Sequence, residues 1–445
     1  MNITQANPEA DIALATPAYG VSRWRAMLKQ ALASDLVRKV VETYATQISL
    51  ILLGLVTTIA VARALGPTGR GLYAVALAMG QIGVQFGHFG YVASNTYYLG
   101  QDRALLPRLL ANSLLVSLSV GVTAALAGGL LFSFRPELAP VHGWLLVLGF
   151  LYIPLGLGFL FSENLLLALH RVRSYNQVEF MNRLLILIMV GAVILFRWVS
   201  AQTVFAAIVV VMGLSNAAAL FVLRPFLAEF PRISIRLLRQ HFGLGLKAYL
   251  IILFSYLLLR IDLLMVKYML GAEQAGYYSV ASSMGDYLLM LPGVIGMILF
   301  PKLSSMQNWR DKLRLSRKAA YAMIVGMVPL LGIAGLAARP AVHILFGAAF
   351  LPSVAAFLWL LPGIFTLGIE TVAVQFLNAM GYPRIVVAIW AVSVALNVGG
   401  NLWAIPHWGI AGASIMSSVS YTLTLVAILA VIHHTERTLV HADAR

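Results

Sequence analysis

Cysteine is absent from this 445-residue chain, and charged residues are scarce. The lack of cysteine excludes disulfide bonds and thiolate metal sites. Only 11% of the residues are charged, whereas a soluble domain carries about 25%, so the composition excludes an ordinary soluble protein. Acidic residues are the scarcer kind, with 16 Asp and Glu against 31 Lys and Arg. Apolar residues make up 60% of the chain, which predicts an integral membrane protein.

Apolar runs recur at lengths that suit membrane-spanning helices. A helix needs about 20 mostly apolar residues to cross a bilayer. Twelve runs meet this length, at about 43–63, 71–93, 109–132, 143–166, 178–199, 203–223, 246–268, 276–299, 319–338, 354–378, 385–405 and 409–432. Residues 340–351 are too short to cross, and we expect a loop or a half-inserted turn there. The predicted fold class is an all-α integral membrane protein with about 12 transmembrane helices.

The distribution of lysine and arginine predicts the orientation of these spans. With a cytoplasmic N-terminus, 23 of the 31 Lys and Arg residues lie in cytoplasmic segments and six lie outside. Cytoplasmic loops are enriched in these residues, so we expect both termini in the cytoplasm. The net charge of +15 sits in short segments beside apolar runs, which indicates membrane lipid rather than nucleic acid as a partner.

One segment of the chain is repeated. Residues 65–80 and 270–285 align without a gap, and eight of the sixteen positions are identical. The offset is close to half the chain, so the sequence consists of two copies of a six-span unit. Six is even, so both copies enter the membrane in the same direction, as parallel repeats do in transporters. We therefore predict two parallel six-helix lobes around a central cleft that opens alternately to each side.

The predicted organisation has five parts. They are a cytoplasmic N-terminal tail with an amphipathic pattern (1–40), an N-lobe with spans 1–6 (41–223), a basic cytoplasmic linker (224–245), a C-lobe with spans 7–12 (246–433) and a cytoplasmic C-terminal tail (434–445). No outside loop is long enough to hold a catalytic domain.

The repeated segment itself has an architectural explanation. Gly66 and Gly271 follow the first span of each copy, where a left-handed glycine ends a helix at little cost. Tyr73 and Tyr278 come next, and amphipathic rings favour the membrane interface. We therefore interpret the segment as a turn and a helix start at the outer face.

The second span has two different faces. Its polar face comprises Gln81, Gln85, His88 and Asn95, and its small face comprises Gly80, Gly83, Gly87 and Gly90. Glycines at helical spacing let a neighbouring helix approach closely. The polar residues either line the substrate path or form interhelical hydrogen bonds. The ordinary pKa of histidine also permits a coupling role for His88.

Charged residues within apolar spans are costly and are functional candidates. Those found here are Glu163, Glu179, Arg183, Arg260, Asp262, Asp286 and Glu370. Glu179 and Arg183 are four residues apart and can pair on one helix. Arg260 and Asp262 are two apart, so each needs a partner elsewhere. The four candidates for ion coupling or gating are Asp262, Asp286, Glu163 and Glu370.

Two of these positions are related by the repeat to other candidates. Asp286 occupies the position of Gln81, which places it on the cleft side of the eighth span. Glu370 matches Glu163 at an offset of 207.

The arginines within the spans suit an anionic cargo. Guanidinium binds phosphate oxygens bidentately, so Arg183 and Arg260 are candidates for contact with a phosphate or pyrophosphate. Structural pairing is the alternative for each. The chain has no Walker A sequence, no His/Glu cluster at metal-ligand spacing and no nucleophile elbow. The sequence therefore predicts no enzyme activity, no metal site and no cofactor.

The order of several short segments resembles the polysaccharide and oligosaccharide flippases of the multidrug/oligosaccharidyl-lipid/polysaccharide (MOP) exporter superfamily. These segments are ARALGPTGRGLY (62–73), RID (260–262) followed by LG (270–271) and GYY (276–278), LFPKL (299–303), ALN (395–397) and IPHWGIAGA (405–413). Together they extend over about residues 40–433.

The resemblance implies a function and a place in the cell. It implies alternating access and movement of polyprenyl-pyrophosphate-linked oligosaccharide across the bacterial inner membrane, for exopolysaccharide, capsule or O-antigen synthesis. It also implies a cationic cavity for the pyrophosphate head, held here by Arg183 and Arg260, with Arg63 at the outer mouth. Glycosyltransferases and a polymerase of the same pathway are the implied protein partners.

Two alternatives stay open at this point. A cation-coupled drug or metabolite antiporter of the same superfamily would use Asp262 and Asp286 as deep, unpaired carboxylates. A membrane scaffold for glycosyltransferases is the other, but it would have no need for a polar path.

Overall fold

The computed structural model describes residues 35–241, 246–381 and 383–443. The chain divides into two units, residues 1–50 and 51–445. In the first unit the described residues, 35–50, are helical, and the predicted tail 1–40 otherwise lies outside the described part. In the second unit the described residues form helices and short turns and include no strand.

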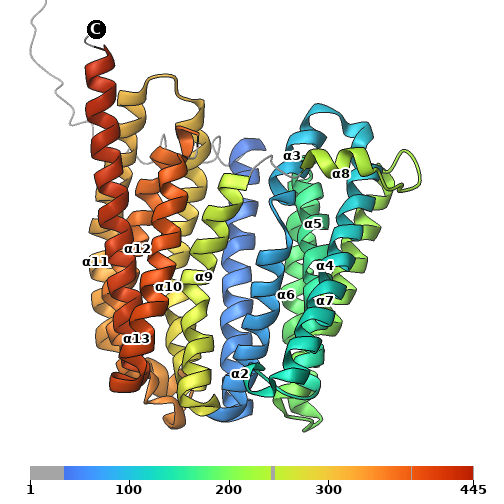
Figure 1. The fold of residues 1–445 in the computed structure, drawn as a ribbon, viewed down its shortest axis with the longest axis vertical. Helices are drawn as coiled ribbons and strands as arrows, with labels where there is room; N and C mark the ends of the chain where they lie inside the picture. Colours follow the sequence, from blue (N-terminus) through green and yellow to red (C-terminus); the bar gives the residue numbers. More distant parts are fainter. Residues whose placement is uncertain (1–34, 242–245, 382, 444–445) are drawn as a thin grey trace, which may run out of the picture. The chain divides into compact units, whose positions relative to one another are not determined.

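The helices follow one another along the chain with few long connections. In order they are α2 (Asp35–Gly87), α3 (Tyr91–Gln101), η1 (Arg103–Leu105), α4 (Leu106–Phe134), η2 (Pro136–Leu138), α5 (Trp144–Ala168), α6 (Val172–Leu195), α7 (Ala201–Leu223), η3 (Arg224–Phe226), α8 (Ile235–His241), α9 (Leu246–Leu270), α10 (Ala272–Ser305), α11 (Trp309–Leu345), η4 (Ala348–Phe350), α12 (Ser353–Ala379) and α13 (Arg384–Asp443). Figure 1 shows their arrangement.

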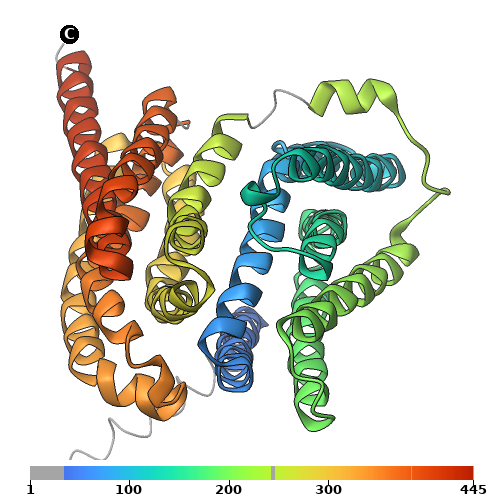
Figure 2. The ribbon, with the colours of Figure 1, turned by 60° about the horizontal axis from the view of Figure 1, so that its bottom comes forward.

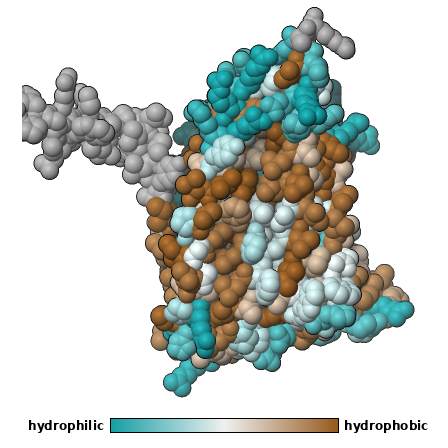
Figure 3. Space-filling model, turned by 90° about the vertical axis from the view of Figure 1, so that its left-hand side faces the viewer, coloured by the Kyte–Doolittle hydropathy of each residue, from teal (hydrophilic) through white to brown (hydrophobic). Residues whose placement is uncertain are grey.

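Ten helices in the described part of the chain are long and apolar enough to cross a membrane. Helices suit lipid because they satisfy their backbone hydrogen bonds internally. Large apolar side chains remain exposed, such as Val325 (73%) and Leu336 (88%) on α11. In Figure 3 such residues form an apolar band between two hydrophilic ends. The protein is therefore a multi-pass membrane protein, as predicted.

Helices α2 and α13 each contain two spans. Their lengths are 53 and 60 residues, and each is bent at a glycine with positive φ, Gly66 (φ 63°) and Gly409 (φ 60°). Glycine adopts such a backbone without the steric cost that a side chain adds. The bends divide each helix into two crossings, so the ten helices account for the twelve predicted spans.

The end of α11 differs from the prediction. The helix continues to Leu345 through Pro340, so half of the expected loop 340–351 is helical. It also begins ten residues before the predicted span, at Trp309, where the Asn308 side chain accepts a hydrogen bond from the Arg310 amide. A search for apolar runs locates the apolar part of a helix and omits its polar ends.

The helices pack in two sets. Helix α5 contacts α3, α4 and α7, and α6 contacts α7; in the other set α12 contacts α10, α11 and α13, and α9 contacts α13. The second half of α2 lies beside α9 (Figure 2), where Tyr249 and Tyr256 donate hydrogen bonds to Phe86 and Gln81. We call the end of the helices that holds Gly66 and Gly271 the turn end, and the end that holds α3, α8 and the last turns of α13 the terminal end.

Candidate functional site

The two copies of the repeated segment contact each other at the turn end. A side-chain carbon on Gly71 would lie 1.8 Å from the carbonyl oxygen of Ala272, and one on Gly276 would lie 1.9 Å from that of Pro67. Positions 71 and 276 are equivalent in the repeat, and so are 67 and 272, so the contact is symmetric. Only glycine permits this backbone approach. The repeated segment is therefore more than a turn, because it joins α2 to α10.

The tyrosines of the segment are inside the protein rather than at its surface. Tyr73 is 5% exposed and Tyr278 is fully buried, and the Tyr278 hydroxyl donates a hydrogen bond to Asp262. The expectation that both rings lie at the membrane interface was wrong. It treated each helix alone, whereas the close contact at Gly71 and Gly276 encloses the residues that follow.

Arg70 reinforces this contact. It is 6% exposed, and its guanidinium donates from Nε to Ser279 Oγ and from Nη2 to Ser283 Oγ, each at 3.2 Å. Both serines are on α10, one turn apart, so the arginine ties α2 to α10 just beyond the glycines.

Arg63 makes a second connection at the turn end. Its exposed guanidinium donates from Nε to the carbonyl oxygen of Leu345 at 2.8 Å and from Nη2 to that of Ile344. These are the last residues of α11, where carbonyl groups lack helical partners. Arg63 therefore holds the end of α11 in this structure.

Helix α9 receives one polar residue from each copy of the repeat. Gln81 on α2 accepts a hydrogen bond from the Tyr256 hydroxyl at 2.9 Å, and Asp286 on α10 accepts one from Arg260 Nη2 at 2.9 Å. Tyr256 and Arg260 are one turn apart on α9. Gln81 and Asp286, which are equivalent in the repeat, therefore both face α9.

The Arg260–Asp286 ion pair is partly buried. The side chains are 25% and 32% exposed, respectively. Asp286 is thus not the unpaired carboxylate that a cation antiporter would use, although an opening of α9 from α10 would free both charges.

Arg183 is the most exposed of the arginines within the spans. It donates from Nε to Glu179 Oε1 at 3.1 Å, the predicted pair on one helix, while its side chain remains 49% exposed. It also lies within electrostatic reach of Tyr73 on α2, Tyr152 on α5 and Tyr287 on α10. Arg183 therefore interacts with residues of three other helices as well as with Glu179 on its own helix.

His88 lies at the junction of α2 and α3, outside the span that ends at Gly87. It is 5% exposed, and its ring centroid is 4.8 Å from that of Tyr249 on α9. Burial lowers the pKa of His88 to about 4, so the imidazole is neutral at physiological pH. Tyr249 also donates to the carbonyl oxygen of Phe86 at 2.9 Å. The histidine thus packs α2 against α9 near the terminal end.

The other polar residues of the second span differ among themselves. Gln85 has its Oε1 buried without a hydrogen-bond partner among the described residues. Asn95 is fully buried and donates from Nδ2 to Ser113 Oγ on α4 at 3.0 Å. Asn95 therefore follows the interhelical alternative, and Gln81 forms a hydrogen bond with α9.

The glycine face of the second span packs closely, as predicted. Added side-chain carbons on Gly80 and Gly83 would lie 2.7 Å and 2.5 Å from atoms of Tyr152 and Ile153 on α5. One on Gly87 would lie 2.5 Å from Val120 on α4. Gly90 differs, because it has φ 79° and precedes α3. The glycines thus fix the second half of α2 to the α4–α5 set.

Three carboxyl groups within the spans form no ion pair among the described residues. Asp262 is 1% exposed and accepts hydrogen bonds from Tyr278 and, at 2.8 Å, from Ser417 Oγ. Glu163 is 9% exposed and Glu370 is 1% exposed, and each has a buried Oε1 without a hydrogen-bond partner in the described part of the chain.

Tyrosines and serines that connect the helices were not among the predicted site residues. Tyr256, Tyr287 and Ser279 were not singled out, although Tyr256 comes one helical turn before Arg260. That spacing is the one signal in the sequence that could have indicated a second polar contact from α9.

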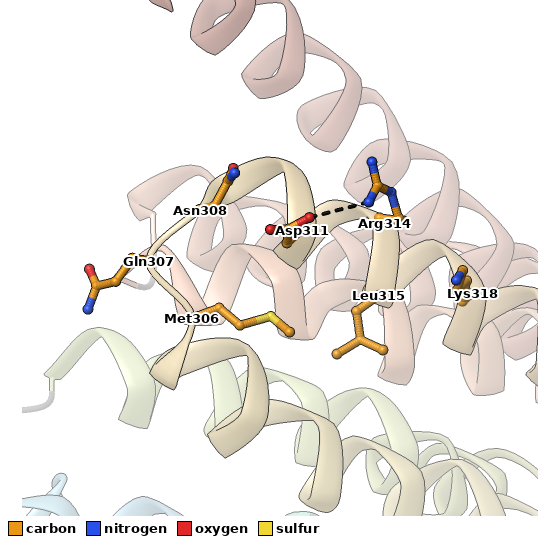
Figure 4. A pocket seen from close by; sticks show the side chains of 7 residues that line it. All are labelled: Met306, Gln307, Asn308, Asp311, Arg314, Leu315 and Lys318. Atoms are coloured by element: carbon orange, nitrogen blue, oxygen red, sulfur yellow. Dashed lines mark hydrogen bonds and ion pairs between the residues drawn. The ribbon is translucent and has the colours of Figure 1, made fainter.

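A polar pocket of about 490 Å³ lies apart from these residues, between the end of α10 and the start of α11 (Figure 4). Its lining residues are Met306, Gln307, Asn308, Asp311, Arg314, Leu315 and Lys318. None of the predicted site residues line it.

Comparison with solved structures defines the class of fold. The lipid II flippase MurJ in an inward closed conformation superposes with a TM-score of 0.71 at 14% identity, over 88% of this chain and 87% of that chain. The MATE multidrug transporter DinF-BH has a TM-score of 0.65 at 13% identity, over 87% and 92% of the two chains. At these identities the likeness shows the fold alone, which is that of the MOP transporters.

Comparison of sequences gives the family. Residues 60–355, well over half of the chain, match the family described as "Polysaccharide biosynthesis protein", and the chain belongs to this family. The predicted resemblance to the polysaccharide branch of the MOP superfamily is thereby confirmed.

Two curated relatives match over shorter segments. A probable flippase, AglR of Haloferax volcanii, is 28% identical over 184 residues, which are 38% of this chain and 37% of that protein. An uncharacterized membrane protein of Methanocaldococcus jannaschii is 26% identical over 193 residues, 42% of this chain and 38% of that protein. The chain thus matches less than two fifths of the length of either relative.

Proposed function

We propose that this protein is a flippase that moves polyprenyl-pyrophosphate-linked oligosaccharide from the cytoplasmic to the outer leaflet of the bacterial inner membrane. The proposal includes cytoplasmic termini, which makes the turn end the outer end, and a role in exopolysaccharide, capsule or O-antigen synthesis. Membership of the polysaccharide biosynthesis family and the MOP transporter fold support a transporter rather than an enzyme.

The exposed guanidinium of Arg183 is the observation that carries the proposal. A charge at this depth is costly unless it has a partner or a function. Arg183 donates one N–H group to Glu179, its side chain is 49% exposed, and it interacts electrostatically with tyrosines of α2, α5 and α10. Such a group suits a pyrophosphate head that enters between the two sets of helices. Arg260 would join it when its pair with Asp286 opens.

Asp262 supports a narrower alternative, cation coupling. It is buried and held by two hydroxyl groups, without a basic side chain in ion-pair contact among the described residues. A cation-coupled antiporter would need such a carboxylate. The pairing of Asp286 with Arg260 argues against the two-carboxylate form of that alternative.

Reconstitution tests the proposal directly. We expect purified protein in vesicles to move a labelled polyprenyl-pyrophosphate sugar between leaflets, and Arg183→Ala to lose most of this transfer. Arg173→Ala is the matched control, because Arg173 is an exposed arginine on the same helix. Equal transfer by Arg183→Ala and Arg173→Ala would remove Arg183 from the path.

A further inference from the structure

The pocket between the end of α10 and the start of α11 carries more positive than negative charge (Figure 4). Arg314 and Lys318 supply two positive charges from successive turns of α11, and Asp311 supplies the one carboxylate of the lining. Arg314 Nη1 lies 3.4 Å from Asp311 Oδ1, and both side chains are more than half exposed. An exposed ion pair of this kind is weak, so a ligand can replace the carboxylate. The lining therefore suits an anion.

Two other lining groups are free to bind a ligand. Lys318 and Gln307 are exposed, and neither side chain has a hydrogen-bond or ion-pair partner in the described part of the chain. The ammonium group of Lys318 and the amide of Gln307 donate hydrogen bonds, and so does the guanidinium of Arg314. Three donor side chains thus line one pocket, which matches the several acceptor oxygens of a phosphate group.

The other exposed arginines at the start of α11 bind a different helix. Arg310 Nη2 lies 3.1 Å from Asp443 Oδ2, and Arg317 Nη2 lies 2.6 Å from Glu436 Oε2. Both carboxylates belong to the last turns of α13, so these two arginines link α11 to α13. Across the described residues, Arg314 and Lys318 form no ion pair with another helix, which leaves them for the pocket.

The pocket lies where the apolar surface of α11 begins. Met306 and Leu315 of its lining pack against the apolar cluster of α9–α13. Lys318 directly precedes the predicted span 319–338, and the exposed side chains that follow are Tyr321 (68%) and Val325 (73%). Lysine and tyrosine at such a boundary favour the depth of the lipid headgroups. The position of the pocket therefore favours a lipid over a soluble anion.

We propose that this pocket binds the phosphate of an anionic phospholipid headgroup. Arg314 and Lys318 contact the phosphate oxygens, Gln307 donates a hydrogen bond to the headgroup, and the acyl chains follow the exposed apolar face of α11 beyond Tyr321. The ligand is a membrane component and differs from the proposed cargo. The site depends neither on the proposed function nor on which side of the membrane the terminal end faces.

Native mass spectrometry of the full-length protein in detergent tests the site. The wild type should retain one molecule of phosphatidylglycerol about tenfold more tightly than Arg314→Ala/Lys318→Ala does, because two charge-assisted contacts are lost. The control is Lys302→Ala/Arg437→Ala, which removes the same charge from exposed positions at the terminal end that do not line the pocket. Equal retention by the two double variants would overturn the site.

Competition separates a lipid headgroup from a soluble phosphate. Inorganic phosphate at the concentration of the lipid should displace little phosphatidylglycerol from the wild type, because it lacks the apolar contacts. Phosphatidylcholine, whose headgroup has no net charge, should bind the wild type more weakly than phosphatidylglycerol does. Displacement by an equal concentration of inorganic phosphate would overturn the assignment to lipid, and equal retention of the two lipids would overturn the selection for an anion.

Discussion

Arg183, whose side chain is 49% exposed, is the residue on which the proposed function depends most. A planar guanidinium binds two phosphate oxygens at once, which an ammonium group does not do. We therefore expect Arg183→Lys to bind inorganic pyrophosphate about tenfold more weakly, for a loss of about 1.5 kcal/mol, because one charge-assisted hydrogen bond is missing. The control is Arg173→Lys, which should bind as the wild type does. Full affinity in Arg183→Lys would indicate that only its charge matters.

His88 predicts how the stability of the protein depends on pH. Its pKa is lowered to about 4 in the folded protein, from an ordinary value of 6.5, because the ring is buried. Between pH 6.5 and 4 the unfolded chain binds a proton that the folded chain does not, so stability falls as the pH falls through this range and is constant above it. The loss at pH 4 amounts to about 3 kcal/mol.

Thermal unfolding in detergent measures this contribution. The unfolding temperature of the wild type should fall more steeply below pH 6.5 than that of His88→Gln. The exposed His142 provides the control, and His142→Gln should keep the wild-type slope. Identical slopes for wild type and His88→Gln would show that the ring is not buried.

At the residue scale, the sequence shows which charged residues lie within the spans but gives less information on which side chains they pair with. The pair of Glu179 and Arg183 was predictable because both lie on one helix, four residues apart. The pair of Arg260 and Asp286 was not, because it depends on how α9 lies against α10. Gln81 and Asp286, which are equivalent in the repeat, both form hydrogen bonds with α9.

At the scale of helices, the glycine contact between α2 and α10 predicts a conformational effect. A methyl group on Gly71 or Gly276 cannot fit beside a backbone oxygen at 1.8–1.9 Å. We expect Gly71→Ala to separate the turn ends, at a cost to the closed state of about 1–3 kcal/mol.

The natural lack of cysteine makes this measurable without removing any residue first. A single thiol introduced by Ser279→Cys, which is buried behind the contact, should react with a water-soluble reagent about tenfold faster when Gly71→Ala is added. Gly293→Ala on α10 is the control, because its methyl group would meet no other atom within 4 Å. Equal rates in the two backgrounds would show that the contact does not close the turn end.

The elements themselves were largely predictable. Apolar length located the spans, and the glycines at 66 and 271 marked the turns, both with positive φ. The ends of helices were less predictable than their apolar centres. The start and the end of α11 depend on capping hydrogen bonds and on contacts with neighbouring helices, which hydropathy does not report. The burial of Tyr73 and Tyr278 followed from a contact between segments 205 residues apart, which no local pattern contains.

At the scale of the molecule, the buried residues show which end of the helices is joined. One apolar cluster includes Val61 and Ala62 of α2 together with Tyr278 of α10 and Val342 of α11, residues near the turn end. A second cluster, which includes Leu258, Leu303 and Leu377, belongs to α9–α13 alone. The two sets of helices therefore share a core toward the turn end and not throughout their length.

This arrangement fits a transporter whose turn end is closed. If the turn end is outside, as proposed, then release to that side requires that the contacts of Gly71, Gly276 and Arg70 separate. The sequence predicted alternating access from the parallel repeat. It did not predict which end is closed, because that depends on the contact energies of one state rather than on composition.

Leaflet transfer with a reversible cross-link tests the central claim most directly. Cysteines introduced by Arg70→Cys and Ser279→Cys, on facing sides of the turn-end contact, would be joined by a short cleavable bifunctional reagent in vesicles. We predict that transfer of a labelled polyprenyl-pyrophosphate sugar stops when the link forms and resumes when it is cleaved, and that either single-cysteine protein is unaffected by the reagent. Continued transfer with the link in place would contradict an account in which the turn end must open.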